Sequence, residues 1–465
     1  MNRRQFLGAS ACLPYLEGQR RRSSNFVVIT IDDLGYADIG PYNPEVNYTP
    51  NLDRMAREGR KLTSFYAAPL CTPSRAALMT GCYPKRVGLE RGSWHGVLFP
   101  GDIHGLHPDE ITVARLLKNR GYATACVGKW HLGDQPEFLP TSHGFDSYFG
   151  IPFSNDMRPE QQIIRGADHP PPPLPLVRDT KVVREVTDQA FLTEAYTEEA
   201  VKFIEANRNR PFFLYLAHSA VHAPLFAGVK FQGKTGKGLY ADSVAECDWS
   251  VGRILETLIR LKVANDTFVL FTSDNGGTPR ASNKPLRGNK GSTWEGGVRT
   301  PAIVWWPGRI DPGEASGEIA SNMDVLPTLA RLAGSEPPND RVIDGKDLSP
   351  VLFGKPGTRS GYRAFYYYAG PDLRAVRSSR WKLHTNGELY DLEADPGESH
   401  NVGSAHAKEV QRLQALLEDA RKDLGDGPLA GANVRPAGKA KTAPRFFIPR
   451  PASTGLAPHE PIKKI

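Results

Sequence analysis

Cys71 is the residue whose neighbours most directly suggest chemistry. It lies in the run LCTPSRAALMTG, residues 70–81, with Pro73 two positions and Arg75 four positions later. Because proline is favoured in the first turn of a helix, the run predicts a helix that begins beside Cys71 and ends at Gly81. The free N–H groups and positive dipole end of such a helix favour an anion. The alternative is a buried structural cysteine, which is the usual role of a lone Cys.

Two predicted strands end in acidic residues. Residues 26–31 form an apolar run that ends in Asp32 and Asp33, and residues 267–272 form another that leads to Asp274 and Asn275. Open α/β sheets bind ligands at the carboxyl ends of their strands. These four side chains offer only hard oxygen atoms, which suit calcium or magnesium. Each motif alone also fits an ordinary turn, but the two motifs together with Cys71 favour a metal site.

Cationic and imidazole groups follow the same pattern. Lys129 and His131 come after an apolar run over 122–127, and His218 and His222 come after one over 211–216. A further cation, Lys290, lies in the glycine-rich segment RGNKGSTWEGGVRTP, residues 287–301. Together these groups could neutralise an anionic substrate and move protons.

These blocks, taken in their order along the chain, resemble the formylglycine-dependent sulfatases, such as arylsulfatase A and N-acetylgalactosamine-6-sulfatase, over residues 25–400. The resemblance implies an alkaline-phosphatase-like fold. It also implies that a formylglycine-generating enzyme converts Cys71 to an aldehyde, whose hydrate supplies the nucleophile. Asp32, Asp33, Asp274, Asn275 and the modified Cys71 would then hold a divalent cation, Ca²⁺ more readily than Mg²⁺, because no nucleotide phosphate is needed to complete the site.

The resemblance and the needs of sulfate ester cleavage assign roles to the remaining residues. Arg75, one helical turn beyond Cys71, would anchor the hydrate and the carboxylates. Lys129 and Lys290 would bind sulfate oxygens as point charges. His222 would protonate the departing alcohol and His131 would act as the base that expels sulfate. Ser154, at a family position that contacts sulfate, is a weaker candidate, and His218 is interpreted as structural.

The chain is too long for one compact core, so we expect two parts. Residues 25–350 alternate strand and helix patterns, which is typical of an α/β sandwich with a large mixed sheet between helices. Residues 355–425 instead predict a small antiparallel sheet, with a hairpin at Asn386–Gly387, and a packed helix over 405–424. The proline run at 170–175 predicts an extended surface connector.

The two ends of the chain have separate properties. Residues 1–24 contain the pair Arg3–Arg4 before a short apolar stretch, which resembles a twin-arginine export signal and predicts a periplasmic location. No run of the sequence is long and apolar enough to insert stably in a membrane. Residues 426–465, rich in Pro, Gly and Lys, predict a disordered tail. Without residues 1–24 and 427–465 the net charge changes from +7 to −3, so the basic balance does not indicate nucleic acid as a partner.

The predicted function is hydrolysis of sulfate monoesters of a sugar or an aryl alcohol. A phosphonate or phosphate ester hydrolase of the same superfamily is the alternative enzyme. An unmodified protein that binds metal and carbohydrate is the non-enzymatic alternative, for which an intact thiol at Cys71 would be the sign. The sequence does not identify the sugar, the sulfated position or the oligomeric state.

Overall fold

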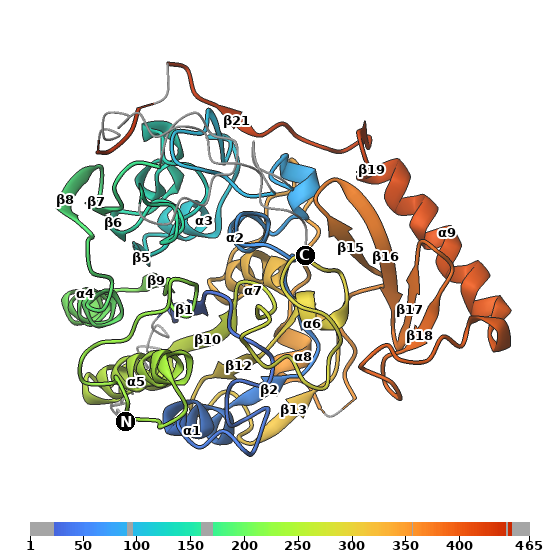
Figure 1. Cartoon of the computed structure of the whole chain (residues 1–465), viewed down its shortest axis with the longest axis horizontal. Helices are drawn as coiled ribbons and strands as arrows, with labels where there is room; N and C mark the ends of the chain where they lie inside the picture. Colours follow the sequence, from blue (N-terminus) through green and yellow to red (C-terminus); the bar gives the residue numbers. More distant parts are fainter. Residues whose placement is uncertain (1–22, 91–95, 160–170, 356, 443–444, 449–465) are drawn as a thin grey trace, which may run out of the picture.

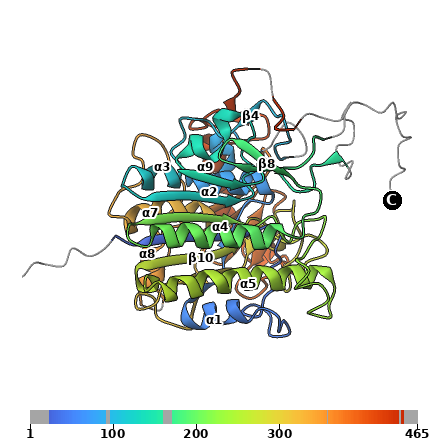
Figure 2. The same cartoon turned by 90° about the vertical axis from the view of Figure 1, so that its left-hand side faces the viewer.

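A ten-stranded mixed sheet lies between two layers of helices in the computed structural model of the chain (Figures 1 and 2). The structure describes residues 23–448 except 91–95, 160–170, 356 and 443–444. The strand order is β13-β2-β12-β10-β1-β9-β5-β6-β7-β8. The predicted sandwich is therefore confirmed.

The centre of the sheet is a set of parallel strands. These are β1 (Asn25–Ile31), β5 (Ala123–Gly128), β9 (Phe212–Ala217) and β10 (Thr267–Ser273). Ile31 pairs with Ser273, and Ala217 pairs with both Thr30 and Gly128. The carboxyl ends of all four strands thus meet at one edge, where the residues that follow them lie close together.

Shorter strands extend the sheet on both sides. Beyond β5 lie β6 (Ser147–Gly150), β7 (Pro175–Arg178) and β8 (Lys181–Glu185). Beyond β10 lie β12 (Ala302–Trp305), β2 (Arg60–Leu62) and β13 (Glu314–Ser316). The expectation of a surface connector at 170–175 is wrong in its described part, because Pro171 and Pro172 are buried and Pro175 begins β7. β7 pairs with β6 only through Val177 and Arg178, whereas its pairing with β8 begins at Pro175. A proline is tolerated there because it is the first residue of the strand.

The helices cover both faces because the strands are apolar on both sides. Val27, Ile29 and Ile31 of β1 face one layer, and Phe26 and Val28 face the other. The first layer holds α1 (Pro50–Glu58), α4 (Leu192–Asn207) and α5 (Leu239–Arg260). The second holds α2 (Cys71–Thr80), α3 (Val113–Lys118), α7 (Val325–Leu332) and α8 (Ser349–Phe353). Buried apolar surface on both faces of β1 is what holds the three layers together.

A second, smaller sheet packs beside the large one, on the right in Figure 1. It is antiparallel and consists of β15 (Phe365–Ala369), β16 (Asp372–Ser378), β17 (Trp381–His384) and β18 (Leu389–Asp391). The predicted hairpin joins β17 to β18, with Gly387 at a φ of 91°. The predicted helix is α9 (Ala407–Asp423), which buries Leu413, Leu416 and Leu417 against this sheet.

Short elements connect the two parts. The three-stranded sheet β11-β3-β14 is made of β11 (Arg299–Thr300), β3 (Phe65–Tyr66) and β14 (Ala320–Ser321), and the short helix α6 (Glu295–Val298) precedes β11. The division of the chain near residue 350 stays a prediction, because α8 at 349–353 still packs within the large domain.

The segment after α9 differs from the disordered tail that we expected. Over its described part it forms the hairpin β19 (Gly425–Asp426) and β20 (Leu429–Ala430), and then β21 (Gly438–Lys439), which pairs with β4 (His104–Gly105). Arg435 Nε also lies 2.7 Å from Oε1 of the buried Glu110. The pairing of β21 with β4 and the ion pair with Glu110 order this segment. The composition of the segment does not predict either contact.

Two further expectations concern the membrane and the leader. Among the helices of the described residues, none has the length and apolar character needed to cross a bilayer. Nearly all of the export signal predicted over 1–24 lies outside the described residues.

Candidate active site

Four oxygen-bearing side chains meet where β1 and β10 end. Asp32 and Asp33 follow β1, and Asp274 and Asn275 follow β10. The backbone N–H of Asp33 donates to Asp274 Oδ1 over 3.3 Å, and Asn275 Nδ2 donates to Asp33 Oδ1 over 2.8 Å. Asp33 adopts a φ of 64°, a backbone conformation that Asp tolerates better than most residues. Asp33, Asp274 and Asn275, which the sequence predicts to act together, are therefore linked by hydrogen bonds.

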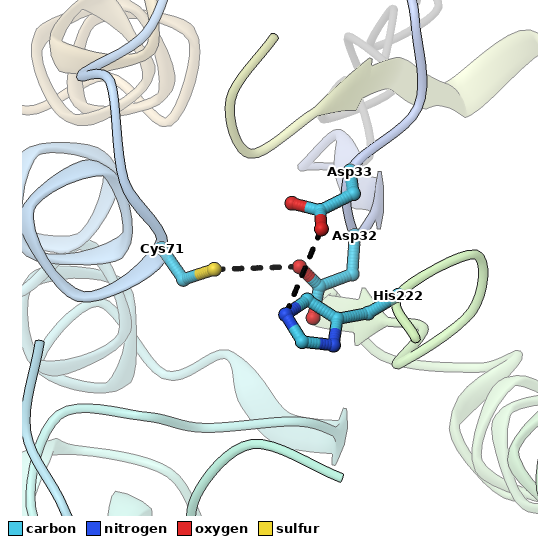
Figure 3. Close-up of side chains that lie close together, drawn as sticks. All are labelled: Asp32, Asp33, Cys71 and His222. Atoms are coloured by element: carbon cyan, nitrogen blue, oxygen red, sulfur yellow. Dashed lines mark hydrogen bonds and ion pairs between the residues drawn. The ribbon is translucent and has the colours of Figure 1, made fainter. Parts of the chain in front are cut away.

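Cys71 is the first residue of α2, and its side chain points at Asp32 (Figure 3). Its Sγ lies 3.4 Å from Asp32 Oδ1 and 3.3 Å from Lys290 Nζ. The residue is 2% exposed. Burial, together with the charge of Asp32, raises the pKa of this thiol far above its usual range, so the unmodified side chain is a neutral thiol.

Three cations neutralise the carboxylates. Arg75 donates from Nε and from one terminal nitrogen to Asp274 Oδ2, over 3.0 and 2.8 Å, and Lys129 Nζ pairs with Asp32 Oδ2. Lys290 Nζ lies 2.6 Å from Asp33 Oδ1. Burial would raise the pKa of Asp32, but the positive charges around it, Lys129 above all, outweigh this effect and hold the pKa far below its usual range.

The two predicted proton-transfer histidines differ in their surroundings. His131 Nε2 lies 2.9 Å from the carbonyl oxygen of Leu98, which fixes Nε2 as the protonated nitrogen. Its Nδ1 is buried and has no hydrogen-bond partner among the described residues. Burial and the charges of Lys129 and Arg75 hold the pKa of His131 well below its usual range, so the ring is neutral and Nδ1 is an acceptor.

His222 lies on the other side of the two carboxylates from Cys71 (Figure 3). Its Nδ1 contacts the carbonyl oxygen of Ala223 at 2.6 Å, and its Nε2 lies 3.6 Å from Asp33 Oδ2. Its side chain is 12% exposed, whereas those of Asp32 and Lys129 are inaccessible. His222 is thus more accessible than Asp32 and Lys129, and close in exposure to Lys290, whose side chain is 15% exposed.

Ser154 and His218 complete the predicted set. Ser154 Oγ accepts from Lys129 Nζ over 3.0 Å, which brings this weaker candidate into the cluster. His218 is fully buried and its Nε2 lies 2.9 Å from Ser250 Oγ on α5, so it faces the helix layer. Its interpretation as a structural residue agrees with this contact.

The donor set fits a hard divalent cation. Asp32, Asp33, Cys71 and His222 each offer an atom within 4.8 Å of the others. Asn275 Oδ1 is buried and has no hydrogen-bond partner among the residues that the structure describes. A buried amide oxygen without a partner is costly, and a cation that it could bind would remove that cost.

Sequence reasoning missed the residues that hold the histidines. Thr72 Oγ1 donates to the carbonyl oxygen of His131 over 3.0 Å and accepts from the N–H of Leu98 over 3.2 Å. Asn155 Nδ2 donates to Gln189 Oε1 over 2.8 Å and lies 3.4 Å from the carbonyl oxygen of His222. These contacts join a side chain to a backbone atom or another side chain that is distant in the sequence, a pairing for which the sequence carries no local signal.

Comparisons with known proteins agree with this geometry. The model of the sulfatase family matches residues 24–335, and the model for the C-terminal part of N-sulphoglucosamine sulphohydrolase matches residues 289–424. The chain belongs to the sulfatase family. Its reaction class is the hydrolysis of sulfate esters, as the sequence predicts, and the enzyme has the alkaline-phosphatase-like fold of that family.

Individual relatives cover most of the sulfatase. N-acetylgalactosamine-6-sulfatase of Canis lupus familiaris is 40% identical over 88% of this chain and 82% of that protein. Arylsulfatase A of Homo sapiens is 40% identical over 85% of this chain and 87% of that protein. The crystal structure of Ps i-CgsB in complex with a k-i-k-neocarrahexaose is 30% identical, with a TM-score of 0.75 over 86% of this chain and 92% of that chain.

A phosphonate monoester hydrolase of Silicibacter pomeroyi is also similar in structure, with a TM-score of 0.61 over 86% of this chain and 95% of that chain. It is 18% identical, so it shares the fold and supports nothing further about the reaction.

A buried charge cluster attaches the small sheet of the sulfatase to the loop that carries Lys290. Lys382 Nζ lies 3.1 Å from Glu295 Oε1 and 2.8 Å from Glu398 Oε1, and it donates to the carbonyl oxygen of Thr293 over 2.8 Å. Glu398 Oε2 also accepts from the N–H of Glu295 over 2.7 Å. Burial would raise the pKa of Glu295, but the charges of Lys382, Arg299 and Arg377 lower it to about 2.

We predict that Lys382→Met destabilises the sulfatase by about 3–5 kcal/mol, because it leaves the buried carboxylates of Glu295 and Glu398 without their shared cation. Urea unfolding followed by tryptophan fluorescence measures the change, and Trp294, whose ring centre is 4.5 Å from that of His384, reports on this region. Lys422→Met removes an exposed lysine of α9 and is the matched control. Equal unfolding midpoints for the two variants would contradict the prediction.

Proposed function

We propose that this sulfatase hydrolyses sulfate monoesters of a saccharide, with Cys71 converted to formylglycine as the source of the nucleophile. The observation that carries the proposal is the position of Cys71 Sγ, 3.4 Å from Asp32 Oδ1 and 3.3 Å from Lys290 Nζ, at the first turn of α2. A nucleophile at this place lies between the candidate metal ligands and a candidate sulfate-binding cation. Conversion requires a formylglycine-generating enzyme as a partner during maturation.

The neutral state of the Cys71 thiol supports the need for conversion. A thiol whose pKa is raised by burial is a weak nucleophile. The hydrated aldehyde supplies a hydroxyl that attacks sulfur and can later release sulfate when its carbonyl re-forms. The described cysteines Cys71, Cys82, Cys126 and Cys247 are all buried and unpaired, and of these Cys71 is the one beside the carboxylates.

A saccharide is the substrate class that the relatives favour. The similar proteins include one named for N-acetylgalactosamine 6-sulfate and one whose structure holds a neocarrahexaose. Aryl sulfates, the alternative that arylsulfatase A suggests, serve in the experiments below as substrates with good leaving groups.

The surroundings of Lys129, Lys290 and Ser154 support a role in binding sulfate oxygens. Lys129 Nζ contacts Ser154 Oγ and Asp32, and Lys290 Nζ contacts Asp33 and Cys71. Both ammonium groups are largely screened from water, so their attraction for an anion is stronger than at the surface. Arg75, which holds Asp274 and donates to the carbonyl oxygen of Lys129 over 2.6 Å, would fix the orientation of this group.

The two histidines would move protons at different stages. His222, whose ring is partly exposed, would donate a proton to the alcohol as the S–O bond breaks. His131, held neutral with Nδ1 free to accept, would take the proton from the hydroxyl of residue 71 as sulfate leaves. The different burial of the two rings supports this division.

Asp32, Asp33, Asp274 and Asn275 would hold the divalent cation together with residue 71. The cation would lower the pKa of a coordinated hydroxyl and polarise the sulfate group. Oxygen ligands with three negative charges favour Ca²⁺, and no phosphate group is needed to complete the site. The twin-arginine-like segment supports export to the periplasm.

The proposed reaction is tested by turnover and by the mass of the peptide that carries residue 71. Purified enzyme should release sulfate from members of a panel of sulfated monosaccharides and from 4-nitrophenyl sulfate, and it should act far more slowly on the matching phosphate and phosphonate esters. Cys71→Ala should reduce turnover by at least about 10⁴-fold while unfolding at the same urea concentration as the wild type.

Cys247→Ala, which removes a buried cysteine of α5, is the control and should retain activity. An unmodified thiol at residue 71 in fully active enzyme would refute the formylglycine proposal, and faster turnover of phosphonate than of sulfate would favour the alternative enzyme.

Removal of the cation should abolish activity. Treatment with a chelator should inactivate the enzyme and lower its melting temperature, because three clustered carboxylates lose a dication. Added Ca²⁺ should restore both properties, and Mg²⁺ should restore less. Asp33→Asn should raise the Ca²⁺ concentration needed for half-maximal stabilisation by at least about tenfold, whereas the exposed control Asp311→Asn should not. Full activity of the chelated enzyme would exclude the metal site.

Substitution of the two histidines should have different kinetic effects. His222→Ala should slow a sugar sulfate by about 10²–10³-fold but slow 4-nitrophenyl sulfate much less, because nitrophenolate leaves without a proton. His131→Ala should give a rapid burst of one equivalent of alcohol per enzyme, followed by slow sulfate release, with either substrate. Stopped-flow absorbance for nitrophenol and ion chromatography for sulfate separate the two steps. Equal losses without a burst would leave the acid and base roles without support.

A further inference from the structure

An open cleft of about 550 Å³ lies next to the loop that carries Lys290. Its lining includes Tyr48, Tyr240 and three cations, Lys237, Arg280 and Lys284. These residues come from the loop before α1, from the start of α5 and the loop before it, and from the loop after β10. The cleft is therefore built from segments at the same edge of the sheet as the candidate active site (Figure 1).

Asp38 and Asn283 connect the wall of the cleft to the active site. Asp38 accepts hydrogen bonds from the N–H of Gly35 over 2.8 Å, the N–H of Ser282 over 2.9 Å and the hydroxyl of Tyr240 over 2.5 Å. Gly35 is two residues beyond Asp33. The loop from the metal-binding segment, the loop after β10 and the start of α5 are thus held together by one buried carboxylate.

Asn283 holds the loop after β10 together through its own hydrogen bonds. It accepts from the N–H of Gly277 over 3.0 Å and donates to the carbonyl oxygen of Gly277 and to Asn289 Oδ1, over 2.9 and 3.1 Å. Asn289 lines the cleft, and the next residue, Lys290, contacts Cys71. The cleft is therefore bordered by the same loop that carries Lys290 to Cys71.

The charge of the cleft is opposite to that of the domain. Residues 25–426 carry a net charge of −3. Lys237, Arg280 and Lys284 are exposed, and none of them forms an ion pair with a carboxylate among the residues that the structure describes. Asp38 is the one carboxylate in the lining, and its oxygens are already engaged by three donors. Three cations without a carboxylate partner among the described residues, gathered in one cleft, favour an anionic group there.

The cleft also has surfaces that suit a sugar ring. Tyr48 and Tyr240 are half-buried, and the ammonium of Lys237 lies 5.6 Å from the centre of the Tyr48 ring. Aromatic faces pack against the apolar faces of pyranose rings, and hydroxyl and amide groups orient polar ligands in such clefts. Tyr240, Ser282 and Asn289 supply such polar groups in the same lining.

We propose that this cleft is a binding subsite for the anionic sugar next to the one whose ester is cleaved, and that Arg280 and Lys284 bind the sulfate or carboxylate of that sugar. The inference rests on the proposed function and adds that the substrate is a polyanionic saccharide chain. A monosulfated sugar alone uses the catalytic site and leaves these contacts unmade. The enzyme selects its substrate by the charge of the sugar next to the one whose ester is cleaved.

The test compares the variant Arg280→Ala/Lys284→Ala with the wild type on four substrates. These are the sulfated monosaccharide that the enzyme turns over best and three disaccharides that carry the same ester, in which the neighbouring sugar bears a sulfate, a carboxylate or no charge. The control Lys408→Ala/Lys422→Ala removes two exposed lysines of α9, which lies on the far side of the small sheet (Figure 1).

For the wild type, we expect KM to be lower for a charged disaccharide than for the neutral one. The Arg280→Ala/Lys284→Ala variant should raise KM for a charged disaccharide about tenfold more than it raises KM for the neutral disaccharide or the monosaccharide, with kcat changed far less. The difference should shrink as salt is added, and the control variant should match the wild type on every substrate.

The two charged disaccharides show which anion the cleft binds, because an effect on one of them identifies the sulfate or the carboxylate. Equal changes in KM for all four substrates, or a wild-type enzyme indifferent to the charge of the neighbouring sugar, would overturn the subsite. A wild-type enzyme that releases no sulfate from any substrate would instead refute the function on which the subsite rests.

Discussion

Three buried carboxylates, Asp32, Asp33 and Asp274, must be neutralised for this fold to exist, and the rest of the site follows from that constraint. Isolated carboxylates cannot be moved out of water without a large free-energy cost. Arg75, Lys129 and Lys290 meet the requirement, and they come from α2, from the end of β5 and from the loop after β10. The same pairing that makes burial possible also brings a cation-rich surface to Cys71, so the stability of the sheet edge and its affinity for anions have one origin.

The small sheet belongs to the same arrangement, although it contributes none of the candidate catalytic residues. A few residues beyond Lys290, Lys382 pairs with the Glu295 carboxylate and donates to the carbonyl oxygen of Thr293. Glu398 accepts from the N–H of Glu295. Tyr66 on β3 and Tyr367 on β15 also donate to Glu295, over 2.5 and 3.0 Å. Buried charges from the small sheet therefore hold the loop that carries Lys290, in addition to the hydrogen bonds that Asn283 makes within it. This explains physically why the small sheet packs on the large domain by way of this loop.

The sequence predicts those parts of the site that depend on a single physical rule. Parallel strands end at one edge of a sheet, so the motifs after β1, β5, β9 and β10 had to meet, and the structure brings all eleven predicted residues together there or next to it. Contacts between distant backbone and side-chain atoms follow no such rule. The Leu98 carbonyl that fixes the tautomer of His131, and the Gln189 side chain that holds Asn155, could not be predicted. The order found in residues 426–442 was missed for the same reason, because Glu110 and β4, its partners, lie more than three hundred residues earlier.

The depth of Cys71 has a consequence for how the enzyme is produced. With 2% of its surface exposed, at the base of a site closed by Asp32 and Lys290, residue 71 is out of reach of another protein once α2 has packed. If the side chain is converted as proposed, conversion and folding compete for each newly made chain, and the first to finish decides the outcome permanently. Active and inactive molecules then share one fold and one stability. The specific activity of a preparation then reflects the fraction of chains converted before folding. Later treatment of the folded protein cannot change that fraction.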